Sequence, residues 1–133
     1  IGVRLVGSEM CIRDRFNTTV KSDEDVIKYG NEILKKGAQS VIISLGGDGA
    51  IYVDQHQSIK AVNPQGHVVN TVGSGDSTVA GMVAGLSMGL NIDEAFQQAV
   101  ASGTATAFSE DLATRDAIEN IKSQVTISVL DGE

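Results

Sequence analysis

A glycine-rich turn that leads directly into an apolar helix constrains this 133-residue chain more than any other feature. Residues 73–76 read Gly-Ser-Gly-Asp, and residues 77–88 are small or apolar. Gly81 and Gly85 lie one turn apart there, which predicts a closely packed helix that ends at Gly89. Glycine can adopt positive φ and bring backbone N–H groups close to a ligand, and the free N–H groups of a first helical turn lie at the positive end of the helix dipole. The segment therefore predicts an anion site suited to a phosphate group.

Asp76 is unexpected inside such an anion site. A carboxylate would compete with the phosphate unless it has another task, and accepting a proton from an attacking hydroxyl group is such a task. The backbone N–H groups beside it could stabilise charge on a migrating phosphoryl group. The alternative is that Asp76 only caps the helix, and these residues alone do not decide between the two. The segment lacks the lysine of a P-loop and the third glycine of a dinucleotide-binding motif.

The rest of the chain alternates between strand and helix signals. Ser22 and the acidic residues after it predict the start of a helix that ends at Gly37. The β-branched run at residues 40–45 predicts a strand buried on both faces, as in a parallel sheet. Further strands are expected at residues 50–54, 58–62, 67–71 and 125–130, and further helices at residues 95–109, started by residues 91–94, and at 114–121. This order predicts an α/β fold.

Charge and composition exclude some partners. The net charge is −7 and no basic patch is visible, which argues against nucleic acid and anionic membranes as ligands. A phosphorylated ligand remains compatible, since backbone N–H groups and a metal ion can supply the positive field. Cys11 has no partner for a disulfide, and His56 and His67 are isolated, which favours surface positions. No apolar run approaches the roughly 20 residues that span a bilayer and no signal peptide is evident, so a cytoplasmic location is expected.

Residues 1–15 differ in character from the rest. They contain three arginines and the single cysteine, and they show no clean helical or strand period. The stretch resembles translated adapter read-through at the end of an assembled sequence, and the alternative is a native strand at residues 1–7. We therefore treat residues 1–15 as a non-native leader, leave them out of the expected fold, and expect residues 16–133 to form the domain.

Residues 70–83 are similar, position by position, to the C-terminal signature of the ribokinase-like sugar kinases of the phosphofructokinase B branch. Residues 44–49 resemble the nucleotide loop of that family, and residues 101–115 are most similar to bacterial 1-phosphofructokinases, with tagatose-6-phosphate kinases as near neighbours. The resemblance runs from Phe16 to the C-terminus. It implies a ribokinase-like, Rossmann-type three-layer α/β/α fold of which this chain is the C-terminal half, without the lid and the N-terminal strands.

The resemblance also implies roles for individual residues. Asp76 would deprotonate the sugar hydroxyl that attacks the γ-phosphate of ATP, within an anion hole made by the N–H groups of Gly73, Ser74 and Gly75. The ATP phosphates and ribose would lie along Ser44, Leu45, Gly46, Gly47, Asp48 and Gly49, and the adenine would lie beside Val100 and Thr104. Mg²⁺ would accompany ATP, and the K⁺ ion of some relatives would be held by backbone oxygens of Asn70, Val72, Thr106, Ser109 and Asp111. The alternatives are a simple turn at residues 44–49 and a helix around Thr104 that serves only close packing.

The function implied is ATP-dependent phosphorylation of fructose 1-phosphate to fructose 1,6-bisphosphate. The alternatives are a tagatose-6-phosphate kinase or 6-phosphofructokinase of the same family, a nucleotide-binding module without catalysis, and a structural fragment without a ligand. A complete member of the family is much longer, and its other half would carry the sugar lid, most sugar contacts and the Asn/Glu motif near magnesium. We therefore expect this chain alone to have little or no kinase activity. A homodimer is the expected assembly of the full-length parent.

Overall fold

The computed structural model describes residues 3–8, 22–37, 40–44, 49–64, 66, 69, 74–108 and 114–130, and at residues 3–8, 44 and 74–76 it describes the backbone alone. The elements run in the order β1 (Val3–Ser8), α2 (Asp23–Lys35), β2 (Ser40–Ser44), β3 (Ala50–Asp54), β4 (Ser58–Val62), α3 (Ser74–Ser87), α4 (Ile92–Ala107), α5 (Arg115–Lys122) and β5 (Thr126–Leu130). The chain forms two compact units, which are Ile1–Lys60 with Ser128–Glu133, and Ala61–Ile127.

The first unit is built on a sheet whose strands lie in the order β1-β2-β3-β4-β5. The β2 strand pairs parallel with β1 and antiparallel with β3, so that Ser40 lies opposite Asp54 and Ser44 opposite Ala50. The prediction of a buried strand is confirmed, because the side chains on both faces of β2 are fully buried at Val41, Ile42 and Ile43. The parallel pairing expected from this pattern holds on one side of β2 only.

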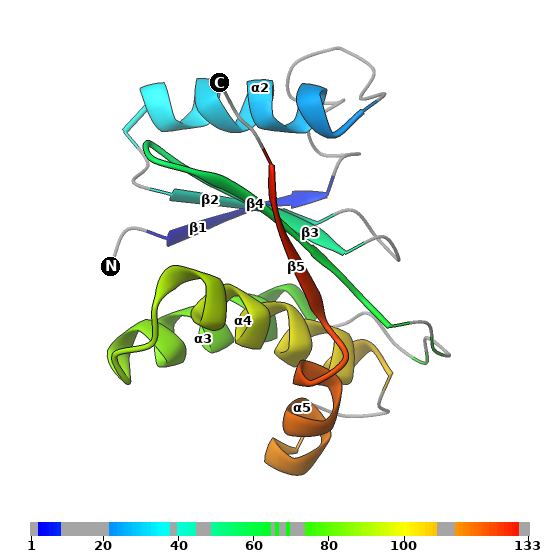
Figure 1. The fold of residues 1–133 in the computed structure, drawn as a ribbon. Helices are drawn as coiled ribbons and strands as arrows, with labels where there is room; N and C mark the ends of the chain where they lie inside the picture. The colour runs from blue at the N-terminus through cyan, green and yellow to red at the C-terminus, as the bar shows by residue number, and fades with distance from the viewer. Residues whose placement is uncertain are drawn as a thin grey trace. The chain divides into compact units, whose positions relative to one another are not determined.

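Helix α2 covers one face of this part of the sheet (Figure 1). Its predicted cap is present, since the Ser22 hydroxyl oxygen accepts a hydrogen bond from the Asp25 N–H at 3.3 Å. Val26, Ile27 and Ile33 of its apolar stripe pack in one core cluster with the β2 and β3 side chains Val41, Ile43, Ile51 and Val53. The helix ends where predicted, with Gly37 at a φ of 110°.

Strand β1 corrects one expectation. Residues 1–15 were left out of the expected fold, yet Val3–Ser8 form a strand that pairs with β2 from Val3↔Ser40 to Ser8↔Ser44. The strand was not predicted because β1 carries an irregularity between Leu5 and Gly7, which interrupts the alternation of a regular strand. The non-native origin of residues 1–15 stays a prediction.

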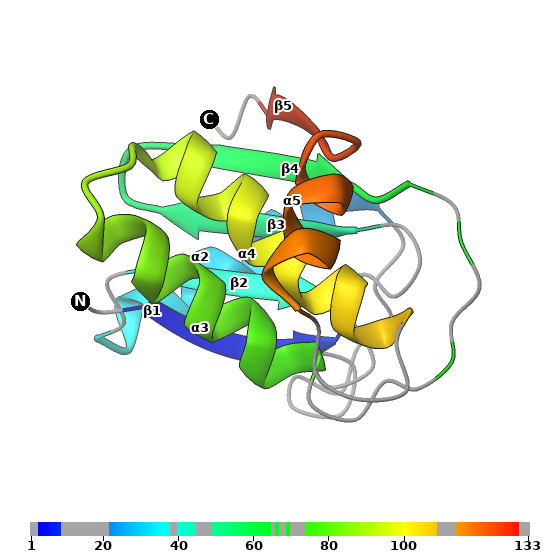
Figure 2. The ribbon, with the colours of Figure 1, turned by 90° about the horizontal axis from the view of Figure 1, so that it is seen from below.

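The second unit contains the helices α3, α4 and α5. Helices α3 and α4 lie side by side in both views (Figures 1 and 2). The predicted caps of α4 and α5 are confirmed, because Asn91 Oδ1 accepts from the Glu94 N–H at 2.9 Å and Thr114 Oγ1 accepts from the Ala117 N–H at 3.2 Å. The sequence predicted that this helix begins at Ser77, but helix α3 begins at Ser74. Within the described residues, no helix has both the length and the apolar character that crossing a bilayer requires.

Candidate functional site

The first turn of α3 holds the residues that the sequence marked for chemistry. Ser74, Gly75 and Asp76 are the first residues of this helix, and Gly73 precedes them outside the described residues. The first N–H groups of an α-helix have no carbonyl partner within the helix and lie at the positive end of its dipole. The backbone here can therefore bind an anion such as a phosphate, while the roles of these residues stay predictions.

The C-terminal turn of α4 is tied to the start of α3. The Thr106 hydroxyl donates a hydrogen bond to Ser77 Oγ at 3.0 Å, and Ser77 directly follows Asp76 in the sequence. Thr106 is only 2 % exposed. On the other side of residues 70–76, the Val69 N–H donates to the Ala107 carbonyl oxygen at 2.8 Å. Adjacent residues of α4 therefore hold both flanks of the predicted anion site.

The predicted monovalent-cation ligands fall partly outside the described residues. Asn70, Val72, Ser109 and Asp111 lie outside them, and Thr106 lies in the last turn of α4. Carbonyl groups in the last turn of a helix carry partial negative charge, which suits them to a cation. The described residues hold no group of three or more His, Cys, Asp or Glu side chains arranged to bind a metal ion.

The two residues predicted to border adenine lie one turn apart on α4 and are largely buried, Val100 at 4 % and Thr104 at 7 % exposure. The Thr104 hydroxyl donates to Asn63 Oδ1 at 2.8 Å. No functional role was predicted for Asn63 or Ser77. Their signal was indirect, since a buried hydroxyl on an apolar helix needs a hydrogen-bond partner.

The predicted nucleotide loop is described only at its ends. Ser44 is the last residue of β2, and Leu45, Gly46, Gly47 and Asp48 lie outside the described residues. Gly49 is buried and has a φ of 103°, a backbone conformation that side-chain-bearing residues rarely adopt. This glycine therefore fits the tight turn expected before β3.

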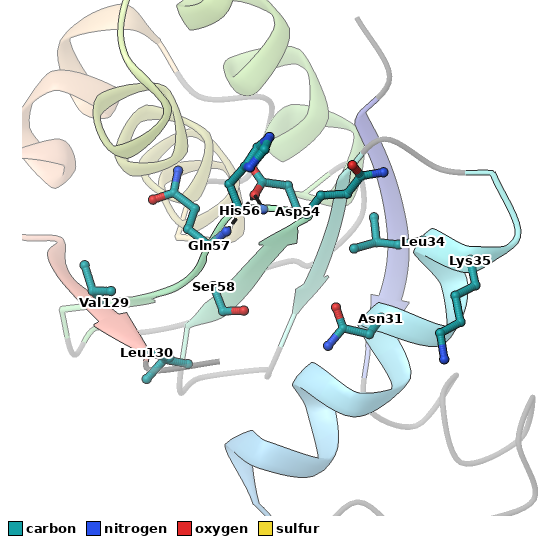
Figure 3. Close-up of a pocket in the computed structure, with 10 residues that line it drawn as sticks. Asn31, Leu34, Lys35, Asp54, His56, Gln57, Ser58, Val129 and Leu130 are labelled. Carbon is teal, nitrogen blue, oxygen red and sulfur yellow. Dashed lines mark hydrogen bonds between the residues drawn. The ribbon is translucent and has the colours of Figure 1, made fainter. Parts of the chain in front are cut away.

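A separate hollow lies in the first unit, between the end of α2, the β3–β4 hairpin and the end of β5 (Figure 3). Asp54 Oδ1 accepts from the backbone N–H groups of His56 and Gln57 at 2.7 and 2.8 Å. Its other oxygen accepts from the Tyr52 hydroxyl at 2.8 Å. This carboxylate holds the hairpin turn, and none of the described residues predicted for the functional site lines the hollow. His56 is exposed, as predicted.

Known proteins resemble this chain over most of its length. A model of the pfkB family of carbohydrate kinases matches residues 7–118. A 1-phosphofructokinase from Bacillus subtilis (strain 168) is 41% identical over 117 residues, which cover 88% of this chain and 39% of that protein. A D-tagatose-1-phosphate kinase from Bacillus licheniformis is 39% identical over 109 residues, which cover 82% of this chain and 36% of that protein.

A solved structure from Staphylococcus aureus, whose assignment as a phosphofructokinase is itself provisional, is 74% identical. It matches with a TM-score of 0.92 over 97% of this chain and 42% of that chain. The predicted ribokinase-like α/β fold is confirmed by this likeness. The chain spans about two fifths of the length of these relatives.

Proposed function

Because this chain belongs to the pfkB family of carbohydrate kinases, we propose that it forms the ATP-binding and phosphoryl-transfer part of a sugar-phosphate kinase. The observation that carries the proposal is the start of α3 at Ser74, inside the segment that matches the family. This helix start provides backbone N–H groups that have no carbonyl partner within the helix, and the Asp76 carboxylate lies in the same turn. Phosphoryl transfer requires little more of a protein than charge stabilisation and a positioned acceptor hydroxyl.

In the proposed reaction, Asp76 accepts the proton of the sugar hydroxyl as its oxygen attacks the γ-phosphorus of ATP. The new bond joins the sugar oxygen to that phosphorus, and the bond to the β–γ bridging oxygen breaks, which releases ADP. The N–H groups of Gly73, Ser74 and Gly75 stabilise the negative charge on the phosphoryl oxygens. The loop at residues 44–49 lies along the ATP phosphates and ribose, and Val100 and Thr104 border the adenine.

Mg²⁺ accompanies ATP in this proposal and neutralises charge on its phosphates when bound. The family resemblance assigns the motif near magnesium to the part of the kinase outside this chain. Thr106 contributes a backbone carbonyl to a K⁺ ion, at the helix end where partial negative charge favours a cation. A cytoplasmic location and a homodimer of the full-length enzyme are parts of the same proposal.

Fructose 1-phosphate is the proposed acceptor, with fructose 1,6-bisphosphate as the product. Two similar relatives support a ketohexose 1-phosphate, because one is named a 1-phosphofructokinase and the other a D-tagatose-1-phosphate kinase. Fructose 6-phosphate and tagatose 6-phosphate are the alternatives within the family. These three sugar phosphates and tagatose 1-phosphate each present a free hydroxyl group to the same base, so the base alone does not select among the four.

The test is a coupled assay of ADP release by the complete kinase that contains this segment. Each of the four sugar phosphates is supplied with ATP and Mg²⁺, and fructose 1-phosphate is expected to give the highest kcat/KM. In parallel, the 133-residue chain is expected to bind a fluorescent ATP analogue while giving little or no turnover. A complete enzyme that binds ATP but phosphorylates none of these sugars overturns the proposal and favours a nucleotide-binding module without catalysis.

A further inference from the structure

The end of α4 touches the chain on both sides of the predicted anion site through consecutive residues. The Thr106 hydroxyl donates to Ser77 Oγ at 3.0 Å, and the Ala107 carbonyl oxygen accepts from the Val69 N–H at 2.8 Å. Phe108 lies against Gly66, where an added Cβ atom would stand 2.5 Å from the phenyl ring. One helix end therefore contacts Gly66 and Val69 before the predicted anion site and Ser77 after it.

The Thr106 contact differs from the hydroxyl contact of Ser102 on the same helix. Ser102, one turn earlier, donates back to the Gln98 carbonyl oxygen of its own helix at 2.8 Å, as serine and threonine in helices commonly do. Thr106 donates across to a different helix, at a position that is 2 % exposed. The bond is part-buried, so its removal is expected to cost the usual net contribution of such a hydrogen bond to stability.

We propose that Thr106 is a positioning residue that sets where the first turn of α3 stands. Its hydroxyl binds Ser77, and the Ala107 carbonyl binds Val69, so one helix turn holds the described residues Val69 and Ser77. Holding the residues on both sides of a segment reduces the conformations that the segment can adopt. In the proposed reaction, that restraint keeps the N–H groups and Asp76 correctly positioned relative to the migrating phosphoryl group. Small errors in such positions lower the reaction rate strongly.

The catalytic part of this inference rests on the proposed function, whereas the anchoring itself does not. Thr106→Val removes the hydroxyl and keeps the branched shape, and Thr106→Ser restores the hydroxyl. Ser77→Ala removes the acceptor. Ser102→Ala is the matched control, because it removes a buried hydroxyl from the same helix that has its bond within that helix.

The first measurement is backbone amide hydrogen exchange in the 133-residue chain. The Thr78 and Val79 amides lie just beyond the anchored turn, and Thr106→Val is expected to speed their exchange about tenfold or more, a change of roughly 1.4 kcal/mol in local opening. Thr106→Ser and Ser102→Ala are expected to exchange like the parent chain at these positions. Unchanged exchange in both Thr106→Val and Ser77→Ala overturns the anchoring role.

The second measurement is steady-state kinetics of the complete kinase with the same substitutions. Thr106→Val and Ser77→Ala are expected to lower kcat by about tenfold or more, with the KM for ATP within about twofold, since the lost interaction acts on the transition state. The double variant is expected to lose less than the sum of the two single variants, because both remove the same bond. Thr106→Ser should recover the parent rate.

The two arms separate the possible failures. A parent kinase that turns over normally together with an unaffected Thr106→Val variant overturns the inference and leaves the proposed function standing. A parent kinase without turnover on any sugar phosphate overturns the proposed function, and hydrogen exchange in the 133-residue chain still decides whether Thr106 anchors α3.

Discussion

Gly81 of α3 lies so close to Ser102 of α4 that a Cβ atom added at position 81 would stand 2.7 Å from the Ser102 hydroxyl oxygen. The same atom would stand 3.0 Å from Ala99 Cα and 3.1 Å from the Gln98 carbonyl oxygen. Backbone atoms such as these cannot move away without shifting a whole helix. The Gln98 side-chain amide also donates to the Gly81 carbonyl oxygen at 3.1 Å, which holds the helices at this separation.

Gly81→Ala is therefore expected to destabilise the chain although alanine favours helices more than glycine. The gain in helix propensity is about 1 kcal/mol, and overpacking costs about 1–3 kcal/mol, so a net loss of about 1 kcal/mol is expected. Urea unfolding of the 133-residue chain measures it. Ser87→Ala, at an exposed position of the same helix, is the control and should not lower the unfolding midpoint. An unchanged or raised midpoint in Gly81→Ala contradicts the close packing.

The parts of the fold that the sequence predicted are those encoded by neighbouring residues. The caps at Ser22, Asn91 and Thr114 were predicted because a cap is a contact between residues a few positions apart. The close packing of α3 was predicted because Gly81 and Gly85 recur at helical spacing, whereas α4 as the helix it packs against was not predicted. Such local patterns can be recognised in the sequence without knowledge of the tertiary structure.

The parts that were missed depend on distant residues. Thr106 and Ser77 are 29 residues apart, and Thr104 and Asn63 are 41 residues apart. No pattern of neighbouring residues therefore predicts either pair. The start of α3 was placed too late because Gly-Ser-Gly at positions 73–75 is typical of a turn, and packing against α4 overrides that preference. Residues 1–15 were excluded for their composition and their lack of a clean period, whereas Val3–Ser8 pair with β2 as a strand.

Gly49→Ala is expected to destabilise the chain by about 1 kcal/mol, because the φ of 103° at this residue is strained for any residue with a Cβ atom. It should also weaken binding of an ATP analogue if residues 44–49 form the nucleotide loop. Gly89→Ala is the matched control, since Gly89 has a φ of 85° and open space around it at the end of α3. Equal weakening of ATP binding by both substitutions contradicts the loop assignment.

The stability of the chain should fall as the pH rises above about 10, and Tyr52 should account for part of the fall. Burial raises the pKa of Tyr52 above its usual value of 10.0, and its hydrogen bond to Asp54 and the Asp54 charge act in the same direction. The unfolded chain therefore loses this proton at lower pH than the folded chain. The contribution of Tyr52 to the free energy of unfolding is fully present below pH 10, and it is lost as the pH rises towards the pKa of Tyr52 in the folded chain.

Tyr52→Phe removes both the hydrogen bond to Asp54 and the titrating group. We expect it to cost about 1 kcal/mol at neutral pH and to make the alkaline fall in stability shallower. Urea unfolding of both chains at a series of pH values between about 8 and 11, spanning the ionisation of an unperturbed tyrosine, measures the two effects. An alkaline slope that is the same in both chains contradicts the assignment to Tyr52.

Asp76→Asn in the complete kinase tests the proposed base. An amide cannot accept the proton of the sugar hydroxyl, so kcat is expected to fall by about 10²- to 10⁴-fold, while the Kd for ATP stays within a few-fold. Asp93→Asn is the matched control, because Asp93 also lies in the first turn of a helix and is exposed. If Asp76 merely complements the helix dipole, both substitutions should cost roughly 0.3–1 kcal/mol of stability and leave kcat unchanged. Weakened ATP binding with unchanged kcat in Asp76→Asn alone would also defeat the assignment, since the carboxylate would then serve the nucleotide and not the acceptor.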